Sequence, residues 1–219
     1  MHKPFPLFLV ILFLFFMHPL IGQGSNLLIQ QYNQGPRLDL SYSKFTFNLG
    51  PQLNRINTDL GTSSPSLTLG AIFEIDYRLT QNVGLVIGGH YTPVRYRYLE
   101  KETVYQDALN YLTLPLFLRL QPTKKISLGL GAIYQLFLKG NQIIENPEEE
   151  IIIAYPKGIF KNSMGLLSQF TYNLNSSLAV FINYRWVRRT SPAIQKETNN
   201  TQGLQLGLTY RLLRLKQRP

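Results

Sequence analysis

The sequence predicts an all-β protein, an eight-stranded antiparallel up-and-down transmembrane β-barrel with short periplasmic turns and long external loops. Two observations predict this fold. Leucine occupies every second position in residues 112–120, and a similar alternation resumes in residues 126–138 after a polar turn. Period-two alternation places the two sets of side chains on opposite faces of a strand. Each apolar face runs for roughly 9 to 13 residues without a charge, which is the length at which a tilted strand crosses a bilayer.

The polar faces of these two strands distinguish a membrane barrel from a soluble one. They carry mainly Gly, Ser, Thr and Gln. A water-exposed surface usually carries about a quarter or more of charged residues. A β-sandwich or a soluble ligand-binding barrel, with the apolar face inside, is the alternative, and the composition favours the membrane barrel.

The N-terminus has the pattern of a secretory signal peptide. Lys3 precedes an apolar run over residues 5–17, which is shorter than the roughly 20 residues of a spanning helix. We expect residues 1–22 to be the signal peptide, with cleavage after Gly22 or, alternatively, Gly24. Residues 23–37 lack a sustained period and are interpreted as a periplasmic lead-in. The chain has no cysteine, so neither a disulfide nor a lipid anchor on cysteine is expected.

The expected barrel covers residues 38–213, and a basic tail follows at residues 214–219. The parity of the first strand switches near Ser43 and Lys44, which predicts a β-bulge there. Pro93 is expected to end the third strand. The expected strands are residues 38–50, 66–80, 83–93, 112–120, 126–138, 159–172, 178–186 and 203–213. The expected long loops, all at one end of the barrel, are residues 51–65, 95–110, 139–157 and 188–202.

Aromatic residues on the apolar faces fall near both predicted membrane edges. Such girdles are typical of membrane barrels, because amphipathic rings favour the headgroup level. The expected periplasmic girdle is Tyr77, Tyr172 and Tyr210, and the expected external girdle is Tyr91, Tyr134, Tyr184 and Trp186.

Three segments resemble the outer-membrane β-barrel family of Bacteroidota that includes PorT-like proteins. Residues 110–116, Asn-Tyr-Leu-Thr-Leu-Pro-Leu, resemble the family's "YLxxPLLLK" strand, and residues 128–131 resemble its Gly-rich strand. Residues 205–210 are similar to its closing strand. Such barrels usually end at an aromatic residue, whereas this chain continues as a basic tail. The resemblance implies an outer-membrane location in a Gram-negative cell and a structural, binding or secretion-accessory role.

The polar faces place charged residues in the predicted lumen. We expect an ion-pair network that fills the barrel, with Glu74 level with Arg185, and Asp76 level with Arg119 and Arg211. The expected network is Glu74, Asp76, Arg78, Arg119, Arg185 and Arg211. The formal net charge of +10 is scattered over turns, loops and strands, which does not favour nucleic-acid binding.

Little in the sequence indicates catalysis. His90 is the one histidine after the signal peptide, and an enzyme acting on lipid would use it as a base with Ser127 or Ser168 as the nucleophile. No set of metal ligands is evident, and no cofactor is expected. We therefore expect a non-enzymatic barrel whose partners are outer-membrane lipid and envelope or secretion-system proteins at its external loops. A small pore and the lipid-modifying enzyme are the alternatives.

Overall fold

The computed structural model describes residues 43–59, 62–100, 103–145, 150–156, 160–188 and 200–216. The expected signal peptide and lead-in lie outside these residues. Within the described ranges, no helix is long and apolar enough to span a membrane. The strands are β1 (Ser43–Thr58), β2 (Ser64–Arg78), β3 (Val83–Glu100), β4 (Thr103–Leu120), β5 (Ile126–Glu145), β6 (Glu150–Ala154), β7 (Ser163–Asn173), β8 (Leu178–Arg188) and β9 (Asn200–Lys216).

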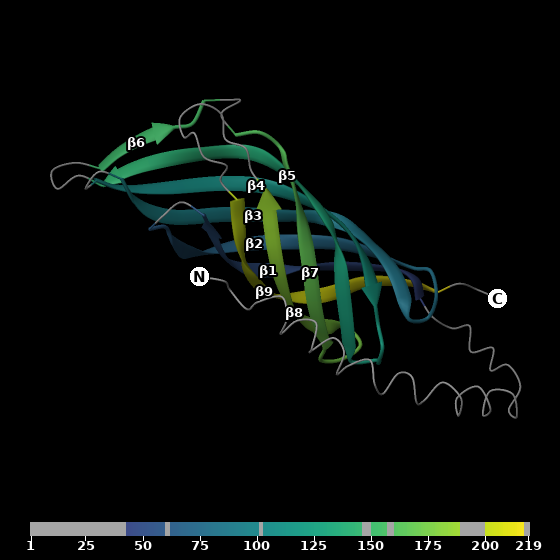
Figure 1. Ribbon diagram of the computed structural model, residues 1–219. Coiled ribbons are helices and arrows are strands. Elements are labelled where there is room, and N and C mark those ends of the chain that lie inside the picture. Colours follow the sequence, from purple (N-terminus) through teal and green to yellow (C-terminus); the bar gives the residue numbers. More distant parts are fainter. Residues whose placement is uncertain are drawn as a thin grey trace, which may run out of the picture. The chain divides into compact units, whose positions relative to one another are not determined.

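Eight of these strands close into an antiparallel barrel (Figure 1). Each strand pairs with its neighbour in the order β1, β2, β3, β4, β5, β7, β8, β9, and β9 pairs with β1. β6 lies outside the ring and pairs with the last residues of β5. The predicted eight-stranded antiparallel barrel is confirmed.

The strands are steeply inclined to the barrel axis. A row of paired residues that begins at Gln135 of β5 returns to β5 at Lys125, ten residues nearer the start of that strand. A shift of this size over eight strands corresponds to a tilt of about 40°. The row passes through Thr113, His90, Ile72, Gly50, Thr209, Ala179 and Asn173.

The two ends of the barrel differ. At one end, called the turn end, short connections join β2 to β3, β4 to β5 and β7 to β8. At the other, called the loop end, the strands themselves are longer than expected. The expected loops at residues 51–65, 95–110 and 139–157 are mostly strand. β1 continues to Thr58, β3 to Glu100 and β5 to Glu145, β4 begins at Thr103, and β6 occupies residues 150–154.

Pro93 does not end β3. The ladder between β3 and β4 runs through it without a shift, with Pro93 opposite Asn110. The ladder between β2 and β3 is interrupted between the pairs Ser66–Arg95 and Ala71–Tyr91, and this interval contains Pro93. The missing backbone donor of proline is thus tolerated at an irregularity in one of its two ladders.

β1 and β9 pair to close the ring, and their contact, called the seam, has two features of note. The register shifts between Ser43 and Phe45, which confirms the predicted bulge near Lys44. β9 runs to Lys216, so Arg214 and Lys216 of the expected tail pair with β1.

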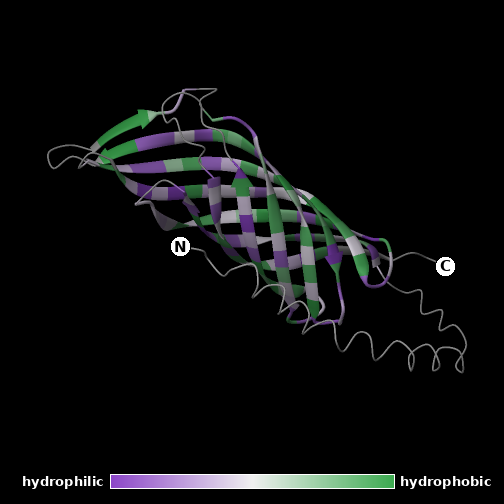
Figure 2. Cartoon of the chain, viewed as in Figure 1, coloured by the Kyte–Doolittle hydropathy of each residue, from purple (hydrophilic) through white to green (hydrophobic). Residues whose placement is uncertain are grey.

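The outer face of the ring is apolar across its middle, where hydrophobic residues recur along the strands in Figure 2. On β2, exposed or half-buried apolar side chains alternate from Leu67 towards Tyr77, and Leu79 follows in the turn. At about 3.3 Å per residue and the tilt above, the segment from Leu67 to Leu79 rises about 30 Å, close to the thickness of a hydrocarbon core. Similar runs, Leu114 to Leu120 among them, are exposed on the other strands.

Candidate functional site

The inner face of the barrel carries a buried carboxylate cluster near the turn end. Arg119 of β4 donates from Nη2 to Glu74 Oε2 at 2.8 Å and from Nη1 to Asp76 Oδ2 at 2.9 Å. Both carboxylates are almost completely buried. Glu74 and Asp76 are successive inward positions of β2, so the period of the strand places them side by side.

Arg119 reaches β2 across the intervening strand β3. The inward residue of β3 opposite Arg119 is Gly84. A Cβ atom at Gly84 would lie 2.4 Å from Asp76 Oδ1. The absence of a side chain at this position therefore leaves the space in which Arg119 and Asp76 meet.

Two further residues complete the cluster. His90 Nε2 lies 3.2 Å from Glu74 Oε1, and Gln169 Nε2 donates to the same oxygen at 3.1 Å. Gln169 Oε1 also accepts from Arg119 Nη2 at 2.6 Å. Parity predicts that both residues point inward, but nothing in the sequence pairs Gln169 with Glu74, which is 95 residues away. Sequence reasoning missed this amide.

The structure brings four of the six expected network residues together. Arg78 Nε lies 3.5 Å from Asp76 Oδ2, so Arg78 joins Glu74, Asp76 and Arg119. Arg211 instead donates to Asn173 Oδ1 and to the Ser176 carbonyl.

Arg185 does not pair with Glu74 as expected. Its Nη2 donates to Gln135 Oε1. The expectation compared heights by counting residues along each strand from the turn end. In the structure, a row of paired residues returns to its first strand ten residues lower after one circuit of the ring. Residues on distant strands with equal counts therefore lie at different heights.

Arg185 belongs to an upper polar layer that consists mainly of amides. Gln205 Nε2 donates to Asn54 Oδ1 at 2.8 Å, and Asn183 lies on the same face of β8 as Arg185. Arg185 is 1% exposed, and within the described part of the chain its Nε and Nη1 atoms have no hydrogen-bond partner. Among the described residues, no carboxylate forms an ion pair with Arg185.

Large side chains fill much of the remaining lumen. Phe117 and Phe181 are buried, and glycine provides the space for their rings: a Cβ at Gly129 would lie 2.8 Å from the Phe117 ring, and one at Gly207 2.4 Å from the Phe181 ring. A polar cavity of about 20 Å³ remains near the turn end, beside Arg119, Arg211 and Ser127. A volume of this size holds about one water molecule.

A cluster of aromatic side chains, called the aromatic cap, lies at the loop end. It consists of Tyr96, Tyr98, Tyr111, Phe137, Tyr155 and Phe160. The Phe160 ring lies 4.8 Å from that of Phe137 and 4.7 Å from that of Tyr155. Asp107 accepts from the hydroxyl of Tyr96 at 2.8 Å and from that of Tyr155 at 2.7 Å.

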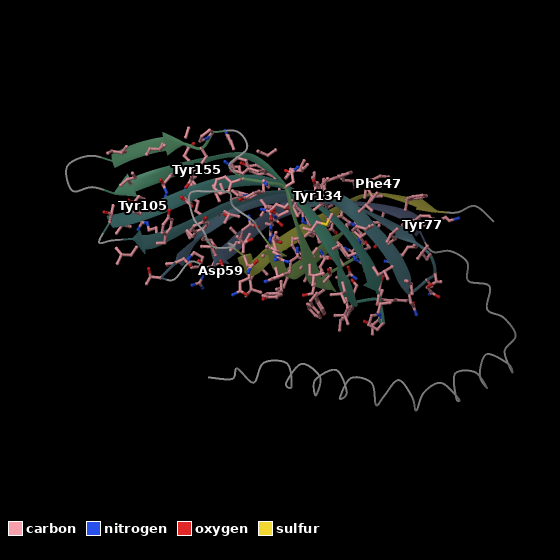
Figure 3. All side chains as sticks on the ribbon, turned by 45° about the horizontal axis from the view of Figure 1, so that its top comes forward. Phe47, Asp59, Tyr77, Tyr105, Tyr134 and Tyr155 are labelled. Carbon is pink, nitrogen blue, oxygen red and sulfur yellow. The ribbon has the colours of Figure 1, made fainter. Side chains whose placement is uncertain are left out.

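The expected girdle residues lie on the outer face. Tyr172 and Tyr210 are exposed near the turn end, and Tyr77 there lies against the Phe45 ring at 4.9 Å. In Figure 3, Tyr77 lies towards one end of the barrel and Tyr105 and Tyr155 towards the other, with Tyr134 between them.

The four residues of the upper girdle, Tyr91, Tyr134, Tyr184 and Trp186, are all exposed. Two of its hydroxyls find polar partners on a neighbouring strand. Tyr91 donates to Asn110 Oδ1 at 2.8 Å, and Tyr184 donates to Gln202 Oε1 at 3.3 Å. An amphipathic ring with its hydroxyl among amides suits the boundary between an apolar and a polar environment.

Among the described residues, no hydrogen bond joins His90 to either serine considered as a nucleophile. His90 is buried against Glu74, and Ser127 lines the small cavity beside Glu74 and Arg119. Ser168 is exposed on the outer face, opposite to the side that His90 occupies. Among the described residues, no group of three or more His, Asp or Glu could hold a metal ion.

Comparisons with known proteins find similarity in structure. No model of a protein family matches the sequence. No curated protein matches it either. The chain is similar to Ail, the attachment invasion locus protein of Yersinia pestis, with 14% identity and a TM-score of 0.47 over 78% of this chain and 99% of that chain.

Two further solved structures are similar at comparable levels. Neisserial surface protein A has 12% identity and a TM-score of 0.44 over 78% of this chain and 98% of its own. OprG from Pseudomonas aeruginosa has 14% identity and a TM-score of 0.44 over 78% and 97%. The fold assignment rests on the strand pairing of this chain itself.

Proposed function

We propose that this protein is a non-enzymatic β-barrel of the Gram-negative outer membrane that binds other envelope components at its external end. The observation that carries the proposal is a closed barrel whose outward face is apolar over about 30 Å and whose polar groups point inward. In water, such an outer face would be unusually apolar for a single chain. In a bilayer it is the lipid contact, since only helices and closed barrels satisfy their backbone there.

The turn end is assigned to the periplasm and the loop end to the outside. Outer-membrane barrels have short periplasmic turns and longer external elements. The expected signal peptide supports the same route, because export precedes insertion from the periplasm.

The lumen supports binding rather than transport. The carboxylate cluster, the buried phenylalanines and the aromatic cap occupy successive levels. An eight-stranded barrel is narrow enough for side chains to fill it. Purified protein in a planar bilayer should therefore show no steady current, and a steady ion current would support the pore instead.

The external extension is the proposed binding surface. It comprises the ends of β3, β4 and β5 together with β6, which continues beyond the level of the upper girdle. β6 presents Ile151, Ile152 and Ile153 as exposed side chains. The resemblance to PorT-like proteins favours a structural or secretion-accessory partner.

A site-specific cross-linking experiment tests this role. A photo-reactive residue is placed at Gln106 or Ile152 in the extension, and at Leu118 on the apolar face as the matched control. We expect protein adducts in whole envelopes from the two external positions and lipid adducts from Leu118. Equal protein adducts at all three positions, or none at the external two, would contradict the proposal.

Absence of enzymatic activity is part of the proposal and needs its own test. Support comes from the hydrogen bonds of the described residues, in which His90 contacts Glu74 and neither Ser127 nor Ser168. A lipid-modification assay should give the same result for the parent protein and His90→Ala. A product formed by the parent and lost in His90→Ala would establish the enzyme.

A further inference from the structure

A ring of exposed cations lies on the outer face just above the upper girdle. Every strand that runs from the turn end to the loop end carries an exposed Arg or Lys where it leaves the apolar region: Arg55 on β1, Arg95 on β3, Lys139 on β5 and Arg188 on β8. We name these four residues the basic collar. In the ring, each of the four strands that carry these residues is separated from the next by one strand that runs in the opposite direction.

The level of the collar follows from the strand register. On β8, Arg188 follows Trp186 at the next outward position, and on β3, Arg95 follows Tyr91 by two outward positions. On one neighbouring strand, Arg95, Lys139 and Arg188 pair with the polar residues Ser66, Asn110 and Asn200. Arg55 lies lowest, beside Leu67 and Leu204. The collar therefore begins at the upper edge of the apolar region, and polar residues accompany its three higher members.

No described carboxylate lies within ion-pair distance of the collar. Asp59, at the same end, accepts from the backbone and side-chain amides of Asn200. Asp107 is buried and held by two tyrosine hydroxyls.

We propose that the basic collar binds the phosphate groups of anionic lipid in the external leaflet. The upper girdle fixes the headgroup level, and long Arg and Lys side chains reach it while their stems remain on apolar surface. Each cation near an anionic lipid surface favours association about fivefold. Four cations distributed around the barrel would recruit anionic lipid on all sides rather than at one groove.

Trp186 provides a native reporter, because it is the single tryptophan of the chain and lies one outward position below Arg188. The protein is reconstituted in phosphatidylcholine bilayers that contain either bromine-labelled phosphatidic acid or bromine-labelled phosphatidylcholine. We expect the phosphatidic acid to quench Trp186 with an apparent association several times stronger, on the order of fivefold.

Arg188→Gln should bring the two lipids close to equal quenching, and Arg55→Gln, two strands away, should have a smaller effect. The matched control is Lys125→Gln, an exposed cation in a turn at the opposite end, which should keep the full preference. Equal quenching by both lipids in the parent, or an equal loss in Lys125→Gln and Arg188→Gln, would overturn the collar. Loss of the preference on adding inorganic phosphate at constant ionic strength would assign the site to free phosphate and also overturn it.

This inference rests on the proposed membrane insertion, and the two can fail separately. If neither labelled lipid quenches Trp186, the barrel is not in the bilayer and the proposed location is wrong. If both quench it equally, insertion stands and only the headgroup preference is lost.

Discussion

Arg119 and Arg185 both lie in the barrel lumen, but their hydrogen-bond partners differ. Arg119 contacts Glu74, Asp76 and the Gln169 amide. Arg185 is buried more completely and donates to Gln135, and the described residues give it no carboxylate. The difference shows that the alternation of side chains predicts whether a charged residue faces the lumen. It does not predict whether an opposite charge lies beside that residue.

The consequence is energetic. Removing one member of a buried ion pair strands the other, whereas replacing a buried charge that has no carboxylate by an apolar group of similar size removes a desolvation penalty. Arg119 should therefore be required for stability, and Arg185 should be dispensable for it.

The largest expected effect is that of Arg119→Met. The substitution leaves Glu74 and Asp76 buried without their principal counter-charge, and we expect the free energy of unfolding to fall by about 3–5 kcal/mol. Urea-induced unfolding from lipid vesicles measures it. A change below about 1 kcal/mol would mean that water already screens the charges of Glu74 and Asp76.

A third environment for arginine is the lipid face. Leu116 is 52% exposed near the middle of the apolar run of β4. Leu116→Arg should cost about 2–4 kcal/mol, because the charge would lie near the bilayer midplane. The matched control is Gln106→Arg on the external part of the same strand, which should cost about 1 kcal/mol or less, through loss of the hydrogen bond from Arg97 Nε and the like charge beside it. Equal effects at the two positions would contradict the proposed membrane level.

Neutralising the stranded carboxylates should reverse part of the first loss. In the Arg119→Met background, Glu74→Gln together with Asp76→Asn removes both charges while it keeps similar shapes. We expect a recovery of about 2 kcal/mol, measured as a coupling energy in a double-mutant cycle that treats the two carboxylates as one unit. Strict additivity would show that Arg119 acts through packing, for example over the Phe117 ring.

The smallest expected effect is that of Arg185→Met. The variant should differ from the parent by about 1 kcal/mol or less, or be slightly more stable, because no carboxylate is stranded. Its effect should add to that of Glu74→Gln within about 0.5 kcal/mol, since the two side chains are not paired. A large loss of stability, or strong coupling with Glu74, would restore the pairing that the sequence predicted.

The fold could be predicted from side-chain parity, and the strand ends could not. Between Leu112 and Leu120 leucine occupies every outward position, so both the strand and its orientation are evident. Beyond the apolar region the contrast disappears: the outward residues of β1 after Leu53 are Arg55 and Asn57, although β1 remains paired to Thr58. Such a strand resembles a polar loop in the sequence.

The candidate site was predictable in part for a related reason. Parity placed Glu74, Asp76 and Arg119 in the lumen, and they meet there. Which arginine reaches Glu74 depends on the shift of ten residues per circuit and on the space at Gly84. Both depend on how the strands align when the whole ring closes. No local pattern of the sequence reveals that alignment.

The seam between β1 and β9 has a consequence for the order of assembly. These are the first and last strands of the barrel, and Gly50 of β1 lies so close to β9 that a Cβ there would overlap the Leu208 carbonyl. A contact between residues this far apart in the chain forms late, because the intervening chain must first be arranged. During assembly, which follows export, the growing sheet therefore has two unpaired edges until β9 is added, and such edges readily pair with other chains. Completion of β9 is the step that converts an aggregation-prone sheet into a closed barrel.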